Sequence, residues 1–170
     1  MASKINRIST CFGFNDRAEE AAKFYVSIFP GGKITGVTHA GENERGGPPG
    51  RVRTVMFTLL GQEFLALNGG PSFKFSDGIS LMVNCTTQKE IDTYWRKLSR
   101  GGEEVVCGWL RDKFGVSWQI VPAGLVDWIT DRDPKKSERV MAAIMTMTKL
   151  DLAALKRARD GKPAVRRRSR

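Results

Sequence analysis

The clearest candidate for chemistry in this chain is Gln119, a polar side chain on the return strand of a predicted hairpin. Trp109 leads into a turn over residues 113–115, and the return strand runs from Ser117 to Val121. Because successive side chains of a strand point to opposite faces, Gln119 and Val121 share one face of the predicted sheet. An amide donates and accepts hydrogen bonds, so this face is suited to orienting a small molecule.

Groups that could transfer protons are few. Glu63, Asp112 and His39 are the acid or base candidates near the predicted rims of a cavity, and a turn role explains Asp112 equally well. Arg53 is the charged residue best suited to contact an anionic substrate, although a salt bridge at the rim is the commoner role of such an arginine. The Gly- and Pro-rich loop at 41–50 is predicted to be either a lid or an ordinary mobile loop.

The chain has 170 residues, which suits one domain or two small fused modules. Its net charge of +10 is concentrated at one end: residues 149–170 hold nine Lys or Arg and two Asp, a net +7, which leaves +3 for residues 1–148. No aromatic residue is interleaved with these charges to stack on bases, so a solubilising tail at 161–170 is favoured over a nucleic-acid site. We expect that tail to be disordered.

Three cysteines, Cys11, Cys85 and Cys107, lie in predicted strands at irregular spacing, and the chain has one histidine. This pattern argues against a disulfide framework and a structural zinc site, so we expect the thiols to be buried as small apolar side chains. No apolar run approaches the length of about 20 residues that spans a bilayer, and the first residues lack the apolar core of a signal peptide. A cytoplasmic protein without membrane contact is predicted.

The elements that must position these residues repeat along the chain. A shift of 70 positions superimposes Thr10 on Ser80, Phe12 on Met82, Glu20 on Glu90, Ile28 on Leu98, and Gly31 on Gly101. Each copy reads strand, helix, Gly-Gly, strand, and a hairpin follows in both. The order predicts an α+β fold in which tandem βαβββ modules form a curved, half-closed mixed sheet.

Local signals support both helices of the repeat. Asp16 with Glu19, and Thr87 with Glu90, have the spacing of a capping box, and apolar residues then recur at helical spacing. Strands are predicted at 33–39, 52–60 and 63–67 in the first copy, and at 103–110 and 116–121 in the second. A helix is predicted over 134–147, and Asp151 is expected to cap another; this C-terminal appendage should cover an open sheet or a partner chain.

Several motifs resemble those of one family. They are Ala-Glu-Glu-Ala-Ala-Lys-Phe-Tyr at 18–25, Phe-Pro-Gly-Gly at 29–32, Cys-Gly-Trp at 107–109, the hairpin at 112–119, and the segment at 140–147. They resemble the PhnB-like branch of the vicinal oxygen chelate superfamily (glyoxalase, bleomycin resistance, dioxygenase), often named as demethylubiquinone 3-methyltransferases. The resemblance implies a homodimer and one glyoxalase-like domain at 4–160, with modules at 4–72 and 77–123 and a helical appendage at 124–160.

The same resemblance points to four positions that bind a metal in related proteins. Here they hold Thr10, Leu65, Ser80 and Gln119, and none is a histidine or a carboxylate, so neither a metal nor another cofactor is expected. We predict either a metal-free cavity that binds a small molecule or a cavity filled by its own side chains. The candidate ligand-binding residues are Thr10, Phe12, Arg53, Leu65, Ser80, Met82, Trp109 and Gln119.

Three functions stay open at this point. The first is the binding of a small organic molecule in a metal-free cavity, with or without a reaction. The second is methyl transfer of the demethylubiquinone type, although no helix is predicted after the glycine cluster at 68–71 to cradle a nucleotide-like methyl donor. The third is sequestration of a small molecule without catalysis, as in the drug-binding members of the superfamily.

Overall fold

The computed structural model describes residues 8–42 and 48–163. A boundary between Lys74 and Phe75, in the segment that joins the two predicted modules, divides the chain into two compact units. The middle of the predicted lid and all but the first three residues of the predicted tail lie outside the described residues. In the described part of the chain, no helix is long and apolar enough to cross a membrane.

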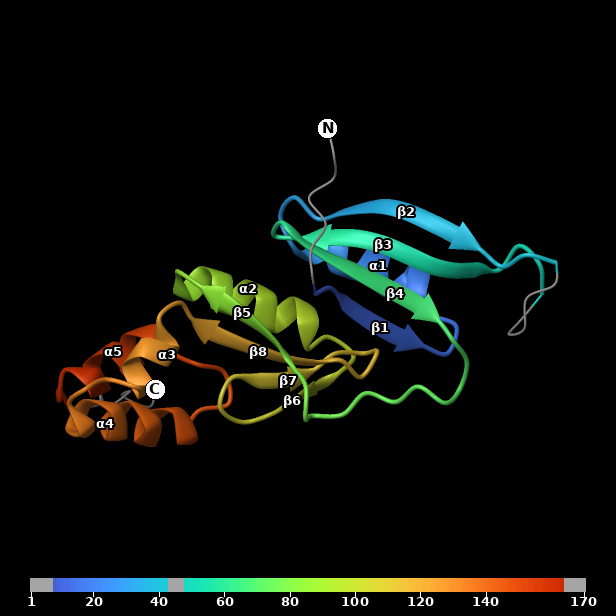
Figure 1. The fold of residues 1–170 in the computed structure, drawn as a ribbon. Coiled ribbons are helices and arrows are strands. Elements are labelled where there is room, and N and C mark those ends of the chain that lie inside the picture. The colour runs from blue at the N-terminus through green and yellow to red at the C-terminus, as the bar shows by residue number, and fades with distance from the viewer. Residues whose placement is uncertain (1–7, 43–47, 164–170) are drawn as a thin grey trace, which may run out of the picture. The chain divides into compact units, whose positions relative to one another are not determined.

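The first unit is a βαβββ module. Its elements are β1 (Thr10–Phe14), α1 (Ala18–Ile28), β2 (Lys33–His39), β3 (Val52–Leu59) and β4 (Gln62–Asn68). The strands form a mixed sheet in the order β1-β4-β3-β2, in which β1 runs parallel to β4 and the other neighbours are antiparallel. Figure 1 shows α1 along one face of this sheet, and we call the other side the open face of the first sheet.

The helix α1 is held to the sheet by a small aromatic core. Ala21, Ala22 and Tyr25 are fully buried on the sheet side of the helix. The ring of Tyr25 lies 6.1 Å from that of Phe12 on β1 and 6.2 Å from that of Phe57 on β3. Burial of each such side chain contributes about 2 kcal/mol, so this stack fixes which face of the sheet is covered.

The predicted capping box at the start of α1 is wrong. The helix begins after Arg17, which makes no capping hydrogen bond through its side chain. Asn68, at the end of β4, takes that role: the N–H of Ala18 donates to Asn68 Oδ1 at 2.8 Å, and Asn68 Nδ2 donates to the carbonyl of Val52 at 2.9 Å. Because the cap comes from a distant strand, local spacing does not reveal it.

The second unit repeats this module and adds three helices. Its elements are β5 (Leu81–Cys85), α2 (Gln88–Leu98), β6 (Glu103–Glu104), β7 (Trp109–Arg111), β8 (Ser117–Pro122), α3 (Leu125–Ile129), α4 (Pro134–Met145) and α5 (Leu152–Arg159). The strand order is β5-β8-β7-β6, again with a parallel first pair. The predicted α+β fold is confirmed as two four-stranded mixed sheets, neither closed into a barrel.

The helix α2 begins where its sequence predicts. The N–H of Glu90 donates to Thr87 Oγ1 at 3.2 Å, and the N–H of Thr87 donates to Glu90 Oε2 at 3.3 Å, which completes the capping box. Ile91, Trp95 and Leu98 then bury one side of the helix. We call the side of the second sheet away from α2 its open face.

The strand predicted at 103–110 is interrupted. It breaks between β6 and β7 because Cys107 and Gly108 both have left-handed backbones, with φ of 63° and 82°. Their N–H groups donate instead to the carbonyls of Met147 and Thr148, at 2.7 and 2.8 Å. The break therefore ties the sheet to the C-terminal helices.

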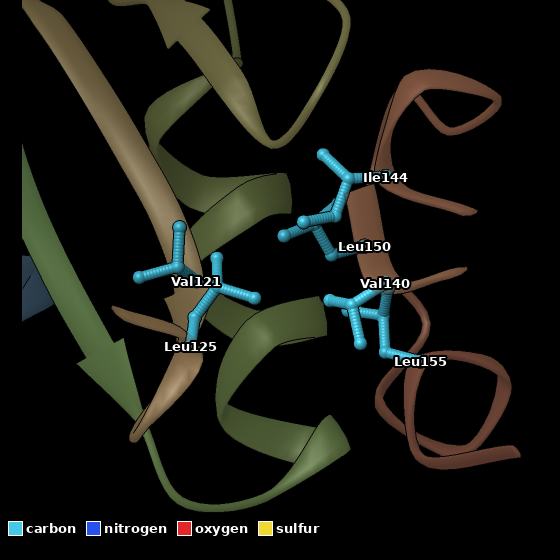
Figure 2. Close-up of a cluster of buried hydrophobic side chains, with 6 residues drawn as sticks. All are labelled: Val121, Leu125, Val140, Ile144, Leu150 and Leu155. Carbon is cyan, nitrogen blue, oxygen red and sulfur yellow. The ribbon is translucent and has the colours of Figure 1, made fainter. Parts of the chain in front are cut away.

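The C-terminal helices pack against the end of β8. Val121 belongs to one buried cluster with five side chains of this appendage, Leu125, Val140, Ile144, Leu150 and Leu155 (Figure 2). By alternation along β8, Val121 lies on the same side as Gln119 and opposite Ile120. The appendage thus covers one end of the open face of the second sheet.

The caps of these helices follow their predicted positions. Pro134 opens α4, and the N–H of Ala154 donates to Asp151 Oδ1 at 2.8 Å to cap α5. Only half of the predicted apolar stripe on α4 is buried, since Met141 and Met145 are exposed.

The internal repeat has two registers. The helices α1 and α2 lie 70 residues apart, but the buried Phe12 of β1 corresponds to Val83 of β5, which is 71 residues later. One extra residue between β1 and α1 causes the difference. The predicted correspondence of Thr10 with Ser80 is therefore wrong, and Ser9 takes that place.

Candidate functional site

Four predicted site residues lie together on the open face of the second sheet. Gln119 of β8 pairs with Met82 on one side and with Trp109 on the other, and paired residues of a sheet share a face. Ser80 joins them, because Gln119 Nε2 donates to Ser80 Oγ at 2.8 Å. All four are predicted ligand-binding residues that the structure brings together on one face, and their role in binding stays a prediction.

A pocket of about 330 Å³ adjoins this row and shares Trp109 with it. Its lining residues are Asp77, Val105, Val106, Cys107, Trp109, Leu110, Arg111 and Ser117. Most of the lining is apolar, and three of its residues, Val105, Val106 and Cys107, lie in the break between β6 and β7. Its size is at the small end of the range for sites that hold organic ligands, about 300 to 1,000 Å³.

The polar groups of the pocket form one hydrogen-bonded set. Asp77 Oδ1 accepts from Ser117 Oγ at 2.7 Å and from Arg111 Nε at 3.0 Å. Arg111 Nη1 donates to Glu103 Oε2 at 2.6 Å. The Ser117 hydroxyl, and after it Arg111, hold the pKa of Asp77 below its ordinary value, so this carboxylate is ionised at neutral pH.

The C-terminal appendage supports the pocket wall at Cys107. Besides the backbone bond from Cys107 to Met147, the thiol of Cys107 donates to the sulfur of Met145 at 3.6 Å. A left-handed conformation is unfavourable for a side chain such as that of Cys107, and these contacts from α4 and the following segment hold it in place. The pocket thus depends on both the module and the appendage.

Asp112 has a structural role in the hairpin. Its side chain is only 3% exposed. Its Oδ1 accepts from the N–H groups of Phe114 and Val116 at 2.8 and 3.1 Å, and its Oδ2 accepts from Trp118 Nε1 at 2.9 Å. Three donors stabilise the charged form, so of the two predicted roles the structure shows the turn role. The other acid or base candidates, Glu63 and His39, are exposed on the first unit.

The open face of the first sheet holds only one predicted site residue. Leu65 pairs with Cys11 on β1 and with Met56 on β3. Thr10 and Phe12, also predicted as ligand-binding residues, lie on the opposite face of the sheet, the side covered by α1. The cause is the extra residue before α1, which shifts the alternation of β1 by one position.

Contacts in the first unit confirm this orientation. Thr10 pairs with Phe64, which is buried under the helix, and the ring of Phe12 stacks on that of Phe64 at 5.8 Å. Arg53 stands two positions before the buried Val55 on β3, so it also points to the helix side of the sheet, where it is exposed. The two units are separate compact bodies, so each set of candidates is described within its own unit.

A divalent metal does not fit the residues present. The positions for which the resemblance implies metal ligands in related proteins hold Ser80 and Gln119 in the second unit, and Leu65 with Thr10, or with Ser9 in the corrected register, in the first. Hydroxyl, amide and alkyl groups are poor ligands for transition metals. Within residues 8–42 and 48–163, no three or more His, Cys, Asp and Glu side chains form a group that could hold a metal ion.

Sequence reasoning missed several residues of the pocket. Val105, Val106 and Cys107 were expected in a regular strand, although Gly108 inside that strand is the kind of residue that marks a bulge. Asp77 lies in the segment before β5 and carries no local signal. Its contact with Ser117 depends on where the chain enters the second sheet.

Comparisons with known proteins identify relatives of both units. The family described as 3-demethylubiquinone-9 3-methyltransferase matches residues 6–121, so the helices α3 to α5 lie outside the match. The solved structure of a PhnB protein from Bacillus cereus is 38% identical, with a TM-score of 0.64, and the match covers 69% of this chain and 100% of that one.

More distant structures extend this comparison. A protein from Staphylococcus aureus is 30% identical over 69% of this chain and 97% of its own, with a TM-score of 0.33. A protein from Pseudomonas aeruginosa is 18% identical over 70% of this chain and 99% of its own, and its TM-score of 0.59 indicates a likeness of fold. No curated protein matches the chain.

Proposed function

This chain belongs to the 3-demethylubiquinone-9 3-methyltransferase family, in its PhnB-like branch, and from that premise we propose that it binds a small organic molecule in the metal-free pocket of its second unit. The observation that carries the proposal is the lining of the pocket, where Val105, Val106 and Trp109 form apolar walls beside the ion pair of Asp77 and Arg111. Apolar walls with a few oriented polar groups are typical of ligand sites.

The chemistry of the lining supports binding over acid–base catalysis. Asp77 is held in its charged form by Ser117 and Arg111, so it is a weak proton donor and a weak base. Asp112, the nearest buried carboxylate in the sequence, is fully used by the hairpin turn. The lining contains no histidine. A protein that sequesters its ligand fits these groups better than one that moves protons.

Methyl transfer, the activity in the family's name, has less support here. Nucleotide-like donors are usually bound by a glycine-rich turn between a strand and a helix. Gly69 and Gly70 follow β4, but the next regular element along the chain is the strand β5. We expect no binding of S-adenosylmethionine in calorimetry, and detectable binding would favour the methyltransferase function.

The pocket can be tested with N-phenylnaphthylamine, a neutral apolar dye whose fluorescence rises on burial. We expect one equivalent to bind the native protein. The substitution Val106→Trp places a large side chain in the pocket wall and should abolish the signal, because the cavity is too small to hold both rings.

The control is Val126→Trp on α3, since Val126 is exposed to a similar degree, 52% against 57% for Val106, and does not line the pocket. This variant should bind the dye as the native protein does. Equal binding by the Val106 variant, or the absence of any binding to the native protein, would refute the proposed site.

A further inference from the structure

The charged groups at the pocket do not balance, and this bears on the class of ligand. The inference rests on the proposed function, because it concerns the same pocket. Arg111 is the only cation of the lining, and it lies between two carboxylates, donating to Asp77 at 3.0 Å and to Glu103 at 2.6 Å. These three side chains together carry a net charge of −1.

Two other charged side chains lie close to the pocket in the sequence, and the first is Lys113. It is not part of the lining, and its Nζ lies over the ring of Phe114, 4.9 Å from the ring centroid. The other carboxylate close in sequence, Glu104, accepts from Trp95 Nε1 at 2.7 Å and from Ser99 Oγ at 3.2 Å, so it belongs to the packing of α2.

The carboxylate of Asp77 has capacity left for a ligand. Both described bonds, from Ser117 and from Arg111, go to Oδ1, and an ionised carboxylate offers further lone pairs on its second oxygen. The side chain is 59% exposed. A positive group that entered the pocket would therefore find an acceptor that is already oriented by two donors.

An aromatic wall lies in the same cavity. Trp109 is half-buried and lines the pocket together with Asp77, and indole is the side chain whose face attracts cations most strongly. An anion is disfavoured, because Arg111 would have to give up its ion pair with Asp77 or Glu103 in order to bind it. The carboxylate of Asp77 and the indole of Trp109 thus both favour a positively charged ligand.

We propose that this pocket selects an organic cation, such as an ammonium or amidinium group on an apolar body. The cation lies beside Asp77 and Trp109, and the apolar body packs on Val105 and Val106. Arg111 acts as a positioning residue that holds Asp77 in place, and Glu103 holds Arg111.

Three naphthyl compounds that differ mainly in the charge of their polar group test this. Naphthylmethylammonium, naphthylmethanol and naphthylacetate compete with N-phenylnaphthylamine for the native protein. We expect the cation to bind about tenfold more tightly than the alcohol, and the anion most weakly. Added salt should weaken the binding of the cation and leave the binding of the alcohol unchanged, because exposed charges are screened.

The variant Asp77→Asn removes the charge but keeps an oxygen that accepts from Ser117. It should reduce the affinity for the cation to within about twofold of the affinity for the alcohol. The matched control Glu138→Gln removes an equal charge from the exposed surface of α4 and should preserve the preference for the cation.

The outcomes separate the two proposals. Equal binding of cation and alcohol, tightest binding of the anion, or an equal loss of all three in Asp77→Asn would overturn the cation preference and leave the pocket as a binding site. Failure of every compound, including the dye, would overturn the binding function itself.

Discussion

The two modules of this chain share one topology but present different chemistry on their open faces. In the first sheet, Leu65 pairs with Cys11 and Met56; in the second, the equivalent Gln119 hydrogen-bonds to Ser80. In both sheets the side facing the helix is packed with large apolar side chains. Strand pairing depends on backbone hydrogen bonds and on the apolar side chains under the helix. The side chains of the open faces can therefore differ while the fold stays the same.

The hairpins of the two modules are also closed in different ways. In the first, Leu60 and Gly61 make a two-residue turn with φ of 48° and 83°, so the backbone itself supplies the bend. In the second, the longer turn from 112 to 116 is organised around the buried carboxylate of Asp112. The second module therefore uses a side chain where the first uses a conformation.

The largest expected effect comes from removing the carboxylate of Asp112, on which only the second hairpin depends. Asp112→Ala leaves the N–H groups of Val116 and of the Trp118 indole without their acceptor and should lower the free energy of unfolding by about 3 kcal/mol in urea titrations. The matching change Leu60→Asn in the first hairpin should stay within about 0.5 kcal/mol, since Asn tolerates a left-handed backbone. A loss below about 1 kcal/mol for the Asp112 variant would contradict the assigned role.

The second largest loss of stability is expected from removing the N-terminal caps of α1 and α2. Asn68→Ala removes two hydrogen bonds that join α1 to β3 and β4 and should cost about 2 kcal/mol, whereas Thr87→Ala removes a local cap and should cost about 1 kcal/mol. Circular dichroism of an isolated peptide over 85–100 should report the loss of Thr87, because that cap needs only neighbouring residues. A larger cost for Thr87 than for Asn68 in the whole protein would reverse the comparison.

The third effect depends on pH and concerns the second module. Burial of Cys85, and after it the charge of Glu90, raises the pKa of its thiol from 9.0 to about 12. The neutral thiol is favoured in the folded state, so this stability is complete below the unfolded pKa and is lost as pH rises towards the folded pKa. The loss should reach about 1.4 kcal/mol near pH 10. The free energy of unfolding from urea titrations should fall more steeply with rising pH for the native protein than for Cys85→Ala. Parallel dependences on pH would contradict the assignment.

The smallest effect compares cysteines of the two modules. Cys11 is exposed on the open face of the first sheet, and Cys85 is buried beneath α2. Cys11 should react with an aromatic disulfide reagent in the native protein and Cys85 only after unfolding, and Cys11→Ser should change stability by less than about 0.5 kcal/mol. Protection of native Cys11 would mean that this face is covered.

The cysteines also show where sequence-based reasoning fell short. The expectation that all three thiols are buried holds for Cys85, is wrong for Cys11, and holds in part for Cys107, which lines the pocket. Alternation within β1 does not tell which set of side chains meets the helix. The one extra residue before α1 reverses that choice for Thr10 and Phe12.

Ser80, Met82, Trp109 and Gln119 are candidates that the sequence predicts, but their position on one common face comes from the strand pairing. The pocket beside them is not predicted from the sequence. It arises where β6 and β7 are interrupted and where Asp77 meets Ser117, and both depend on contacts between segments far apart in the chain.

The amino-acid sequence alone indicates the duplicated strand–helix–strand module, the two longer C-terminal helices and the cap at Thr87, because these depend on residue types and short-range spacing. Only the folded structure decides which face of β1 meets the helix, how Asn68 caps α1, and where the pocket forms. Strand register and loop position depend on pairing with residues tens of positions away, and a local pattern does not record that pairing.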